Sequence, residues 1–242
     1  GEKFFQKHSN RMQIPGIGTL DPSVDPDHAP LMVINTAEAL IGAAQMGTIE
    51  LHTCSATADM IDRPDCMVFD LDPDPGLSWK AVAEGAQLTK VILDELGLKS
   101  FLKTSGGKGL HLVVPLARRH TWDEVSDFSQ AVAQHLARSL PKHFSARMGE
   151  KNRVGKIFVD YLRNKRQAST VATYSARARP GLAVATPIAW EELKDVNSSA
   201  MWTIASLPGR LAKLKKDPWA DYFKTRQTLT AAMKKKLGMT GK

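Results

Sequence analysis

The sequence predicts an α+β fold, similar to an α/β sandwich, in which helices flank a mixed or antiparallel central sheet. The first observation is the order of elements, since strand, helix, hairpin, helix and further strands follow one another along the 242 residues. The second is that the regular strand–helix–strand alternation of a doubly wound fold is missing. The third is the composition, 43% hydrophobic and 24% charged residues, which is typical of a globular protein.

The amino-terminal part predicts one short helix followed by two strands. Residues 36–46 have the composition of a helix that Gly47 closes. The segments TIELHT at 48–53 and CMVFDL at 66–71 are apolar, contain β-branched residues and are bounded by turn residues, as strands are. The DPDPG segment at 72–76 predicts that the second strand stops before it.

A helix, a hairpin and a second helix are predicted for the middle of the chain. Ser78 is suited to cap a helix whose apolar residues recur at helical spacing as far as Gly97. Residues 101–116 contain two apolar strands joined by a glycine-rich loop, which predicts a β-hairpin. Thr121 and Glu124 have the spacing of a capping box at the start of the next helix.

Two more strands and a mainly helical end complete the prediction. The strands are KIFVDY at 156–161 and STVATY at 169–174, and the helical part covers about residues 187–242. The two cysteines, Cys54 and Cys66, are too few for a disulfide framework or a CxxC metal site. With no run of eighteen apolar residues and no signal-peptide pattern, we expect no membrane partner and a cytoplasmic location.

The net charge of +8 is unevenly distributed along the chain. Residues 147–179 hold nine Lys and Arg against two acids, and residues 210–242 hold ten against two. Residues 21–74 instead hold eleven acids and the single Arg63. A polyanion such as DNA would prefer the two basic segments, and the acidic segment would suit metal cations. The alternative for each charged run is a solvated surface.

The sharpest motif is FDLD at 69–72, in which Asp70 and Asp72 lie two residues apart in a predicted strand. Residues two apart point to the same face, so both carboxylates aim at one region, where their repulsion favours a bound cation. Asp160 ends the apolar segment IFVD and is a natural third ligand. A DxD pair alone is weak evidence, but charge inside an apolar strand is expensive. Oxygen ligands of this kind suit two Mn²⁺ or Mg²⁺ ions in nucleotidyl transfer.

The second motif is the loop SGGKGLH at 105–111, which joins the strands of the predicted hairpin. It lacks the GxxxxGK[ST] pattern of a P-loop, although a glycine turn can offer backbone N–H groups to an anion. Ser105 adds a hydroxyl, Lys108 a charge, and His111 follows on the strand. A triphosphate cradle is the functional interpretation, and a plain hairpin turn is the alternative.

Several further residues suit nucleic-acid or nucleotide binding. Arginine favours bidentate phosphate contacts, and aromatic groups beside basic ones suit base stacking. For a lone histidine on a strand a core position is the commoner explanation, and for the phenylalanine pair a hydrophobic staple is equally open. The residues concerned are His52, Phe4, Phe5, Lys7, Arg163, Arg166 and Arg177.

Six segments together resemble the polymerase domain of bacterial DNA ligase D, which belongs to the archaeo-eukaryotic primase superfamily. The resemblance runs from residue 4 to about 193 and follows the family's motif order. The segments are FFQKH (4–8), ELHT (50–53), VFDLDPDPG (68–76), KTSGGKGLHLVVPL (103–116), VDYLRN (159–164) and YSARARPGLAVATP (174–187).

The resemblance implies specific roles for the candidate residues. It implies that Asp70, Asp72 and Asp160 are metal ligands, and that nucleotide binding involves a second group: His52, Ser105, Lys108, His111 and Arg177. It implies that Phe4 and Phe5 pack against template DNA. Residues 165–170 differ from the expected glycine-containing turn, so roles there are unassigned.

The resemblance also implies an activity and a domain organisation. We expect one primase-like polymerase domain over 1–242. We also expect it to be a fragment that lacks the family's further amino-terminal stretch, where part of a 5′-phosphate site would lie. It would add nucleotides, ribonucleotides above all, to 3′-hydroxyl DNA ends and gapped duplex with a 5′-phosphate in non-homologous end joining. The implied setting is the nucleoid, with Ku and fused ligase or phosphoesterase modules as partners.

Three other functions stay open at this point. A replicative-type primase would start strands de novo, and a manganese-dependent glycosyltransferase also uses a DxD pair but needs no basic segments. A non-catalytic DNA-end-binding module would use the acids only for structure.

Overall fold

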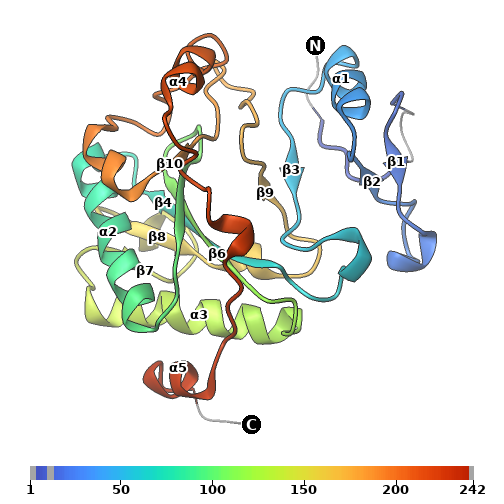
Figure 1. Cartoon of the computed structure of the whole chain (residues 1–242). Coiled ribbons are helices and arrows are strands. Elements are labelled where there is room, and N and C mark those ends of the chain that lie inside the picture. The colour runs from blue at the N-terminus through green and yellow to red at the C-terminus, as the bar shows by residue number, and fades with distance from the viewer. Residues whose placement is uncertain (1–3, 10–13, 240–242) are drawn as a thin grey trace. The chain divides into compact units, whose positions relative to one another are not determined.

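The computed structural model describes residues 4–9 and 14–239 of the chain and divides it into two compact units, Gly1–Ile49 and Glu50–Lys242 (Figure 1). Each unit is described by itself. In the described residues, no helix combines the length and the apolar character that crossing a bilayer requires.

The first unit is built from short elements. Its helix α1 (Ala37–Gln45) begins at Thr36, whose hydroxyl accepts the N–H of Ala39, and it is followed by Gly47 in the left-handed region, as predicted. Two antiparallel two-residue strands, β1 (Gly18–Thr19) and β2 (Met32–Val33), form a small ribbon.

The second unit contains the central sheet, whose strand order is β10-β5-β6-β4-β8-β7. Neighbouring strands are antiparallel except β7 and β8, which are parallel, so the sheet is mixed, as predicted. A separate antiparallel pair is formed by β3 and β9. The strands are β3 (His52–Thr53), β4 (Cys66–Pro73), β5 (Phe101–Thr104), β6 (Leu110–Pro115), β7 (Phe144–Ser145), β8 (Ile157–Asp160), β9 (Thr170–Val171) and β10 (Pro187–Ile188).

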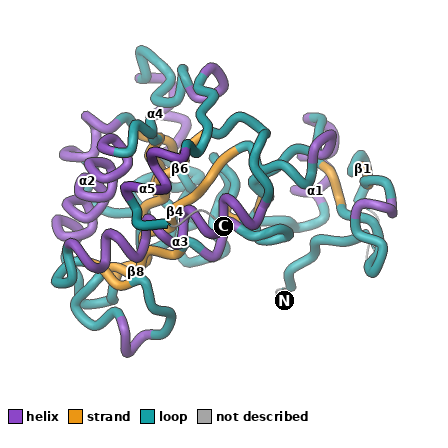
Figure 2. The backbone as a smooth tube through the Cα atoms, turned by 90° about the horizontal axis from the view of Figure 1, so that it is seen from below, coloured by secondary structure: helices purple, strands orange, loops and turns teal. Residues whose placement is uncertain are grey.

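Two long helices pack against one face of this sheet. They are α2 (Trp79–Glu95), capped by Ser78, and α3 (Trp122–Ser139), which begins with the predicted capping box of Thr121 and Glu124. Both contact β4, and Figures 1 and 2 show them beside the sheet. Apolar side chains that alternate along the strands meet those of the helices in one core: Met67, Phe69, Leu71, Leu110, Leu112, Val82, Ala86, Val125, Phe128 and Val132.

The opposite face of the sheet therefore carries the other set of alternating side chains. On β4 this set is Cys66, Val68, Asp70 and Asp72. Cys66 and Val68 pack with Val113 of β6. Trp219 packs against these three residues and covers the apolar end of this face. The other end of the same strand carries Asp70 and Asp72, and the candidate site lies there.

Several segments differ from their sequence predictions. The strands predicted over 48–53 and 169–174 are shorter, since β3 and β9 hold two residues each. The strand β4 does not stop before the DPDPG segment but continues to Pro73, because β8 pairs with it as far as Pro73↔Ile157. Beyond Leu71 its pairing with β6 has ended, so a residue without an N–H is tolerated there.

The carboxy-terminal part is less helical than expected. It begins with β10, since Pro187 and Ile188 pair with β5, and it contains the short helices α4 (Leu207–Lys213) and α5 (Ala231–Lys236) within the described residues. The single-domain organisation over 1–242 stays a prediction.

Candidate active site

Four polar side chains stand in one row across four adjacent strands. The register pairs Lys103 of β5 with His111 of β6, His111 with Asp70 of β4, and Asp70 with Asp160 of β8. Directly opposed residues of antiparallel strands project to the same face with close β-carbons. Asp72, two residues beyond Asp70, projects to that face too. The fold thus brings the three predicted carboxylates to one region.

Asp70 and Asp160 each have a cationic or ring-nitrogen neighbour. His111 Nε2 lies 3.3 Å from Asp70 Oδ1, and Arg163 Nε donates to Asp160 Oδ2 at 3.1 Å. The backbone N–H of Leu162 also donates to Asp160 Oδ1 at 2.8 Å. These contacts offset part of the repulsion expected between two carboxylates in register.

Asp72 is ion-paired with Arg153, a residue that the sequence did not single out. Arg153 comes from the segment before β8 and is largely buried, with its side chain 15% exposed. Each of the three aspartates thus has a positively charged or histidine partner. Any cation that binds Asp72 has to compete with this guanidinium.

The two central carboxyls differ in their pKa values. Burial alone would raise the pKa of Asp70, but His111, Arg163 and Arg177 outweigh it and hold this pKa below the ordinary value. Burial dominates at Asp160 and raises its pKa in spite of Arg163 and the N–H of Leu162. The negative charge of Asp70 adds to that rise. A bound cation near both groups would stabilise the two neighbouring negative charges.

The glycine loop between β5 and β6 is stabilised by its own first residue. Ser105 Oγ is buried and accepts the N–H groups of Gly107 at 3.2 Å and Gly109 at 3.3 Å. Those two N–H groups are therefore used in hydrogen bonds inside the turn. Binding of a triphosphate by this loop stays a prediction. Lys108 is exposed at the tip of the loop, where its charge faces solvent.

The loop also lies close to the DxD strand. A β-carbon at position 109 would lie 1.8 Å from the carbonyl oxygen of Leu71, the residue between Asp70 and Asp72. Gly109 is thus required by the close approach of two backbones, and this contact places the loop beside the carboxylates.

Glu50 connects two predicted nucleotide-binding residues. Its Oε2 lies 2.9 Å from His52 Nε2, and its Oε1 accepts Arg177 Nε at 3.1 Å. Arg177 Nη1 in turn donates to the carbonyl oxygen of Ser105 at 2.8 Å. Glu50 was not predicted as a site residue, because its link to Arg177 spans 127 residues of sequence.

Replacing Glu50 with glutamine is expected to weaken this connection and to change the pH dependence of stability. Burial would raise the pKa of Glu50, but His52, the Ala178 N–H and Arg177 lower it from 4.5 to about 2. That difference corresponds to at most about 3 kcal/mol of stability. Since the folded pKa is the lower one, this stability is complete above about pH 4.5 and is lost as the pH falls toward 2.

The measurement for Glu50→Gln is urea unfolding of parent and variant between pH 2.5 and 7. The difference in unfolding free energy should be largest at pH 7 and should shrink as the pH is lowered. A difference that stays constant across this range would contradict the ionic role of Glu50.

Lys103 is a second residue of the site that the sequence did not single out. It is 3% exposed, and its Nζ donates to the carbonyl oxygen of Val171 on β9 at 2.6 Å. Burial lowers its pKa to about 8, although Asp70 opposes that shift. Because β9 pairs with β3, Lys103 ties the ribbon that carries His52 to the central sheet.

The predicted DNA-binding residues lie in both units. Phe4 and Phe5 are 55% and 64% exposed, and Lys7 is partly buried. Arg163 is paired with Asp160, and Arg166 Nε donates to Asp62 Oδ1 at 2.7 Å. The structure thus leaves the two phenylalanine rings accessible and gives both arginines acidic neighbours.

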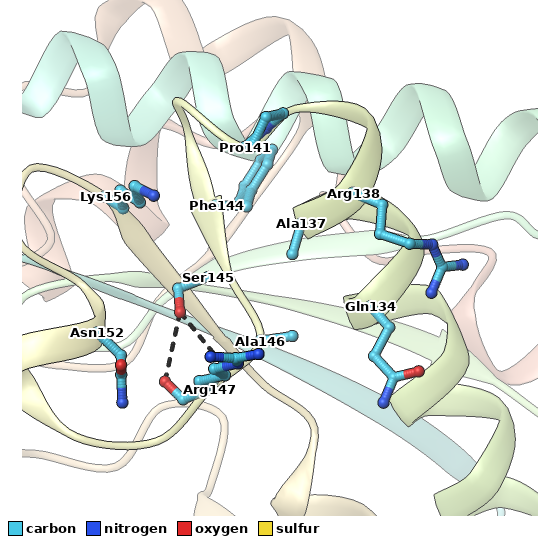
Figure 3. A pocket seen from close by; sticks show the side chains of 10 residues that line it. All are labelled: Gln134, Ala137, Arg138, Pro141, Phe144, Ser145, Ala146, Arg147, Asn152 and Lys156. Atoms are coloured by element: carbon cyan, nitrogen blue, oxygen red, sulfur yellow. Dashed lines mark hydrogen bonds between the residues drawn. The ribbon is translucent and has the colours of Figure 1, made fainter.

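A cavity of about 520 Å³ lies near the parallel pair β7 and β8 (Figure 3). Figure 3 shows α3 contributing Gln134 and Arg138 on one side, facing the segment Ser145–Arg147. None of the predicted site residues lines this cavity, so it is separate from the carboxylate row.

Comparison with known proteins identifies the family. The family model described as "LigD, primase-polymerase domain" matches residues 1–219. The chain is 60% identical over 239 residues to the multifunctional non-homologous end joining protein LigD of Pseudomonas aeruginosa, covering 98% of this chain and 28% of that protein. The bifunctional LigD of Bacillus subtilis is 31% identical over 166 residues, covering 68% of this chain and 27% of that protein.

A solved structure supports the same assignment. The polymerase domain of Mycobacterium tuberculosis ligase D, in complex with DNA, matches with a TM-score of 0.78 and 29% identity, covering 87% of this chain and 76% of that chain. The chain spans about a quarter of the length of the curated relatives it matches. The chain therefore belongs to the family of LigD primase-polymerase domains, which makes it a polymerase-type nucleotidyltransferase domain.

Proposed function

We propose that this chain adds nucleotides, ribonucleotides above all, to 3′-hydroxyl DNA ends and fills gaps that carry a 5′-phosphate, in non-homologous end joining. The observation that carries the proposal is the register of Asp70, Asp160 and His111 on one sheet face, with the glycine loop beside it. Family membership and the DNA complex of the M. tuberculosis domain support it.

Two divalent ions, Mn²⁺ or Mg²⁺ with Mn²⁺ favoured, are proposed to bind Asp70, Asp72 and Asp160. The donor set fits, because all three ligands are carboxylates and two of them stand in register. Bound ions would lower the pKa of the primer hydroxyl and neutralise the leaving pyrophosphate.

The protein's own groups would bind and orient the nucleotide. His52 and Arg177 are held by Glu50, and Arg177 also contacts the loop at Ser105. Lys108 and Arg177 would neutralise charge that develops on the phosphates. His111, fixed beside Asp70, completes the nucleotide-binding group, and Ser105 acts through the shape of the loop.

Replacing Lys108 with alanine is expected to weaken binding of a nucleoside triphosphate about tenfold and to leave DNA affinity nearly unchanged. The side chain is exposed at the loop tip, so the fold should not suffer. Binding is measured with a labelled triphosphate and, separately, with a labelled duplex. Lys80→Ala, an exposed lysine of α2, is the control. A loss of DNA affinity instead would make the loop a DNA contact.

DNA is proposed to bind through Phe4, Phe5, Lys7, Arg163 and Arg166. The phenylalanines would stack on bases, and the basic groups would contact phosphates. Ku and fused ligase or phosphoesterase modules are proposed partners. The longer relatives are named multifunctional and bifunctional non-homologous end joining proteins. A cytoplasmic, nucleoid-associated location follows from this substrate.

Replacing Arg166 with glutamine tests the phosphate contacts without disturbing Asp160. Each lost contact to duplex phosphate should make the slope of log affinity against log salt shallower by about 0.9. DNA affinity is measured for parent and variant at several salt concentrations. If the slope stays unchanged, Arg166 does not contact DNA phosphate, and the proposed DNA contact is wrong at this residue.

Extension of a gapped duplex tests the proposed function as a whole. A duplex with a short gap and a 5′-phosphate is incubated with ribo- or deoxynucleotides and with Mn²⁺ or Mg²⁺. The expected result is extension of the existing 3′ end, fastest with ribonucleotides and Mn²⁺. Products started de novo on an unprimed template would favour a replicative-type primase, and tight DNA binding without extension would favour a non-catalytic end-binding module. Transfer from a nucleotide sugar without DNA binding would favour a glycosyltransferase.

A further inference from the structure

A cluster of side chains of the types that bind metal ions lies in the first unit, which contains none of the carboxylates of the row. His8 Nε2 lies 2.9 Å from Asp25 Oδ2, and His28 Nδ1 lies 2.9 Å from Asp25 Oδ1. One ligand atom from each of these residues lies within 4.8 Å of the other two. The two imidazole rings are stacked with centroids 5.0 Å apart and an interplanar angle of 20°. Both rings thus present a nitrogen to the same carboxylate.

The backbone holds these three residues together from distant parts of the unit. His8 forms an antiparallel bridge with Leu31, and Ser9 donates its N–H to the carbonyl oxygen of Pro30 at 2.9 Å. The N–H of His28 donates to the carbonyl oxygen of Asp25 at 3.1 Å, which fixes the turn between them. The arrangement is therefore built by the chain and does not depend on long exposed side chains meeting by chance.

The central carboxylate is buried although the unit has little apolar interior. Asp25 is 5% exposed, whereas the fully buried hydrophobic residues among the described part of 1–49 are Ala39 and Ala43. A buried carboxylate is expensive unless it is paired or coordinates a metal. Small units with a small core commonly depend on a disulfide or a metal, and residues 1–49 contain no cysteine.

We propose that His8, Asp25 and His28 bind one Zn²⁺ ion. Two imidazole nitrogens with one carboxylate oxygen are ligands that suit Zn²⁺, and they leave a fourth position for water. Mn²⁺ and Mg²⁺ prefer oxygen ligands, so this site differs in metal preference from the carboxylate row. The ion fastens the segment 4–9, with Phe4 and Phe5, to the loop at 21–28. Its effect on DNA binding rests on the proposed function, but zinc binding itself does not.

The test measures zinc binding to the whole chain after treatment with a chelator. Titration calorimetry reports the affinity, and the visible absorption of Co²⁺, used in place of Zn²⁺, reports the coordination geometry of the bound ion. The variants are His28→Ala and His28→Gln, because the His28 side chain is 54% exposed and its removal leaves no buried gap. His135→Ala on α3 is the matched control, and Asp70→Asn separates this site from the carboxylate row.

The parent, His135→Ala and Asp70→Asn are expected to bind one Zn²⁺ with similar affinity. Both His28 variants should bind it at least about tenfold more weakly and lose the rise in melting temperature that zinc gives the parent. The proposal is overturned if the parent binds no zinc at micromolar concentration, or if His28→Ala and His28→Gln bind it as the parent does. It is also overturned if zinc binding is lost in Asp70→Asn, since the ion then occupies the carboxylate row. DNA extension that fails while zinc binds normally counts against the proposed function alone.

Discussion

Replacing Asp70 with asparagine is expected to lower the rate of nucleotide addition by at least about 10³-fold, or about 4 kcal/mol in activation free energy. Asp70 occupies the centre of the row, paired in register with both His111 and Asp160. Asparagine keeps the size of the side chain but removes the charge that would hold a divalent ion. The fold and the affinity for DNA should survive, because the variant keeps the size of the side chain and replaces none of the groups proposed to bind DNA.

Primer extension under single-turnover conditions measures the rate, and a gel-shift assay measures DNA affinity. Asp127→Asn is the matched control, since it makes the same chemical change on an exposed position of α3. The control should extend primers at the parent rate. Near-normal extension by Asp70→Asn would contradict the assignment of the metal ligands.

Replacing Gly109 with alanine is expected to lower the free energy of unfolding by at least about 3 kcal/mol. The new β-carbon would lie 1.8 Å from the carbonyl oxygen of Leu71, and backbone on both sides would have to move apart. That movement would also break the contacts that the Gly109 carbonyl oxygen makes with the N–H of Ser105 and the hydroxyl of Ser199. Nucleotide addition should fall together with stability.

Gly107 in the same loop provides the control for this prediction. A β-carbon there would meet Ser105 Oγ at 3.4 Å, which is an ordinary contact. Gly107→Ala should therefore cost less than about 1 kcal/mol. Urea unfolding of both variants measures the difference. Equal losses of stability would show that the close approach of the loop to β4 is not what requires glycine at 109.

Local patterns in the sequence predicted much of the fold. The capping box of Thr121 and Glu124, the helix that begins after Ser78 and the hairpin at 101–116 all depend on residues close together in the chain. Alternation along 66–72 also predicted correctly that Asp70 and Asp72 share a face. The mixed sheet and the family resemblance are confirmed, the latter by the family model and the relatives.

Contacts across long stretches of sequence could not be predicted in this way. Glu50 meets Arg177, Arg153 meets Asp72, and Lys103 meets the carbonyl oxygen of Val171, each from a different segment. Patterns in a single sequence show how residues are spaced within one helix or strand, but they do not show the order of the strands in the sheet. Only the predicted hairpin could have pointed to Lys103 as a site residue. Once the register of its two strands is assumed, Lys103 lies opposite His111.

The role of Ser105 shows a second limit of local patterns. Its hydroxyl accepts two backbone N–H groups within the loop, which the sequence alone does not show, and the phosphate contact expected for it stays a prediction. Similarly, the prolines at 73 and 75 predicted that the strand ends before residue 72, but pairing with β8 extends β4 as far as Pro73. Both cases depend on which neighbours the fold supplies.

Binding of Mn²⁺ in the presence of a non-hydrolysable nucleoside triphosphate is the most direct test of the carboxylate row. The electron paramagnetic resonance signal of free Mn²⁺ is followed as protein is added, for the parent, Asp70→Asn and Asp127→Asn. Two ions per chain are expected for the parent and for Asp127→Asn, with a marked loss for Asp70→Asn. Equal binding of Mn²⁺ by all three proteins would contradict a metal–nucleotide site at Asp70, Asp72 and Asp160.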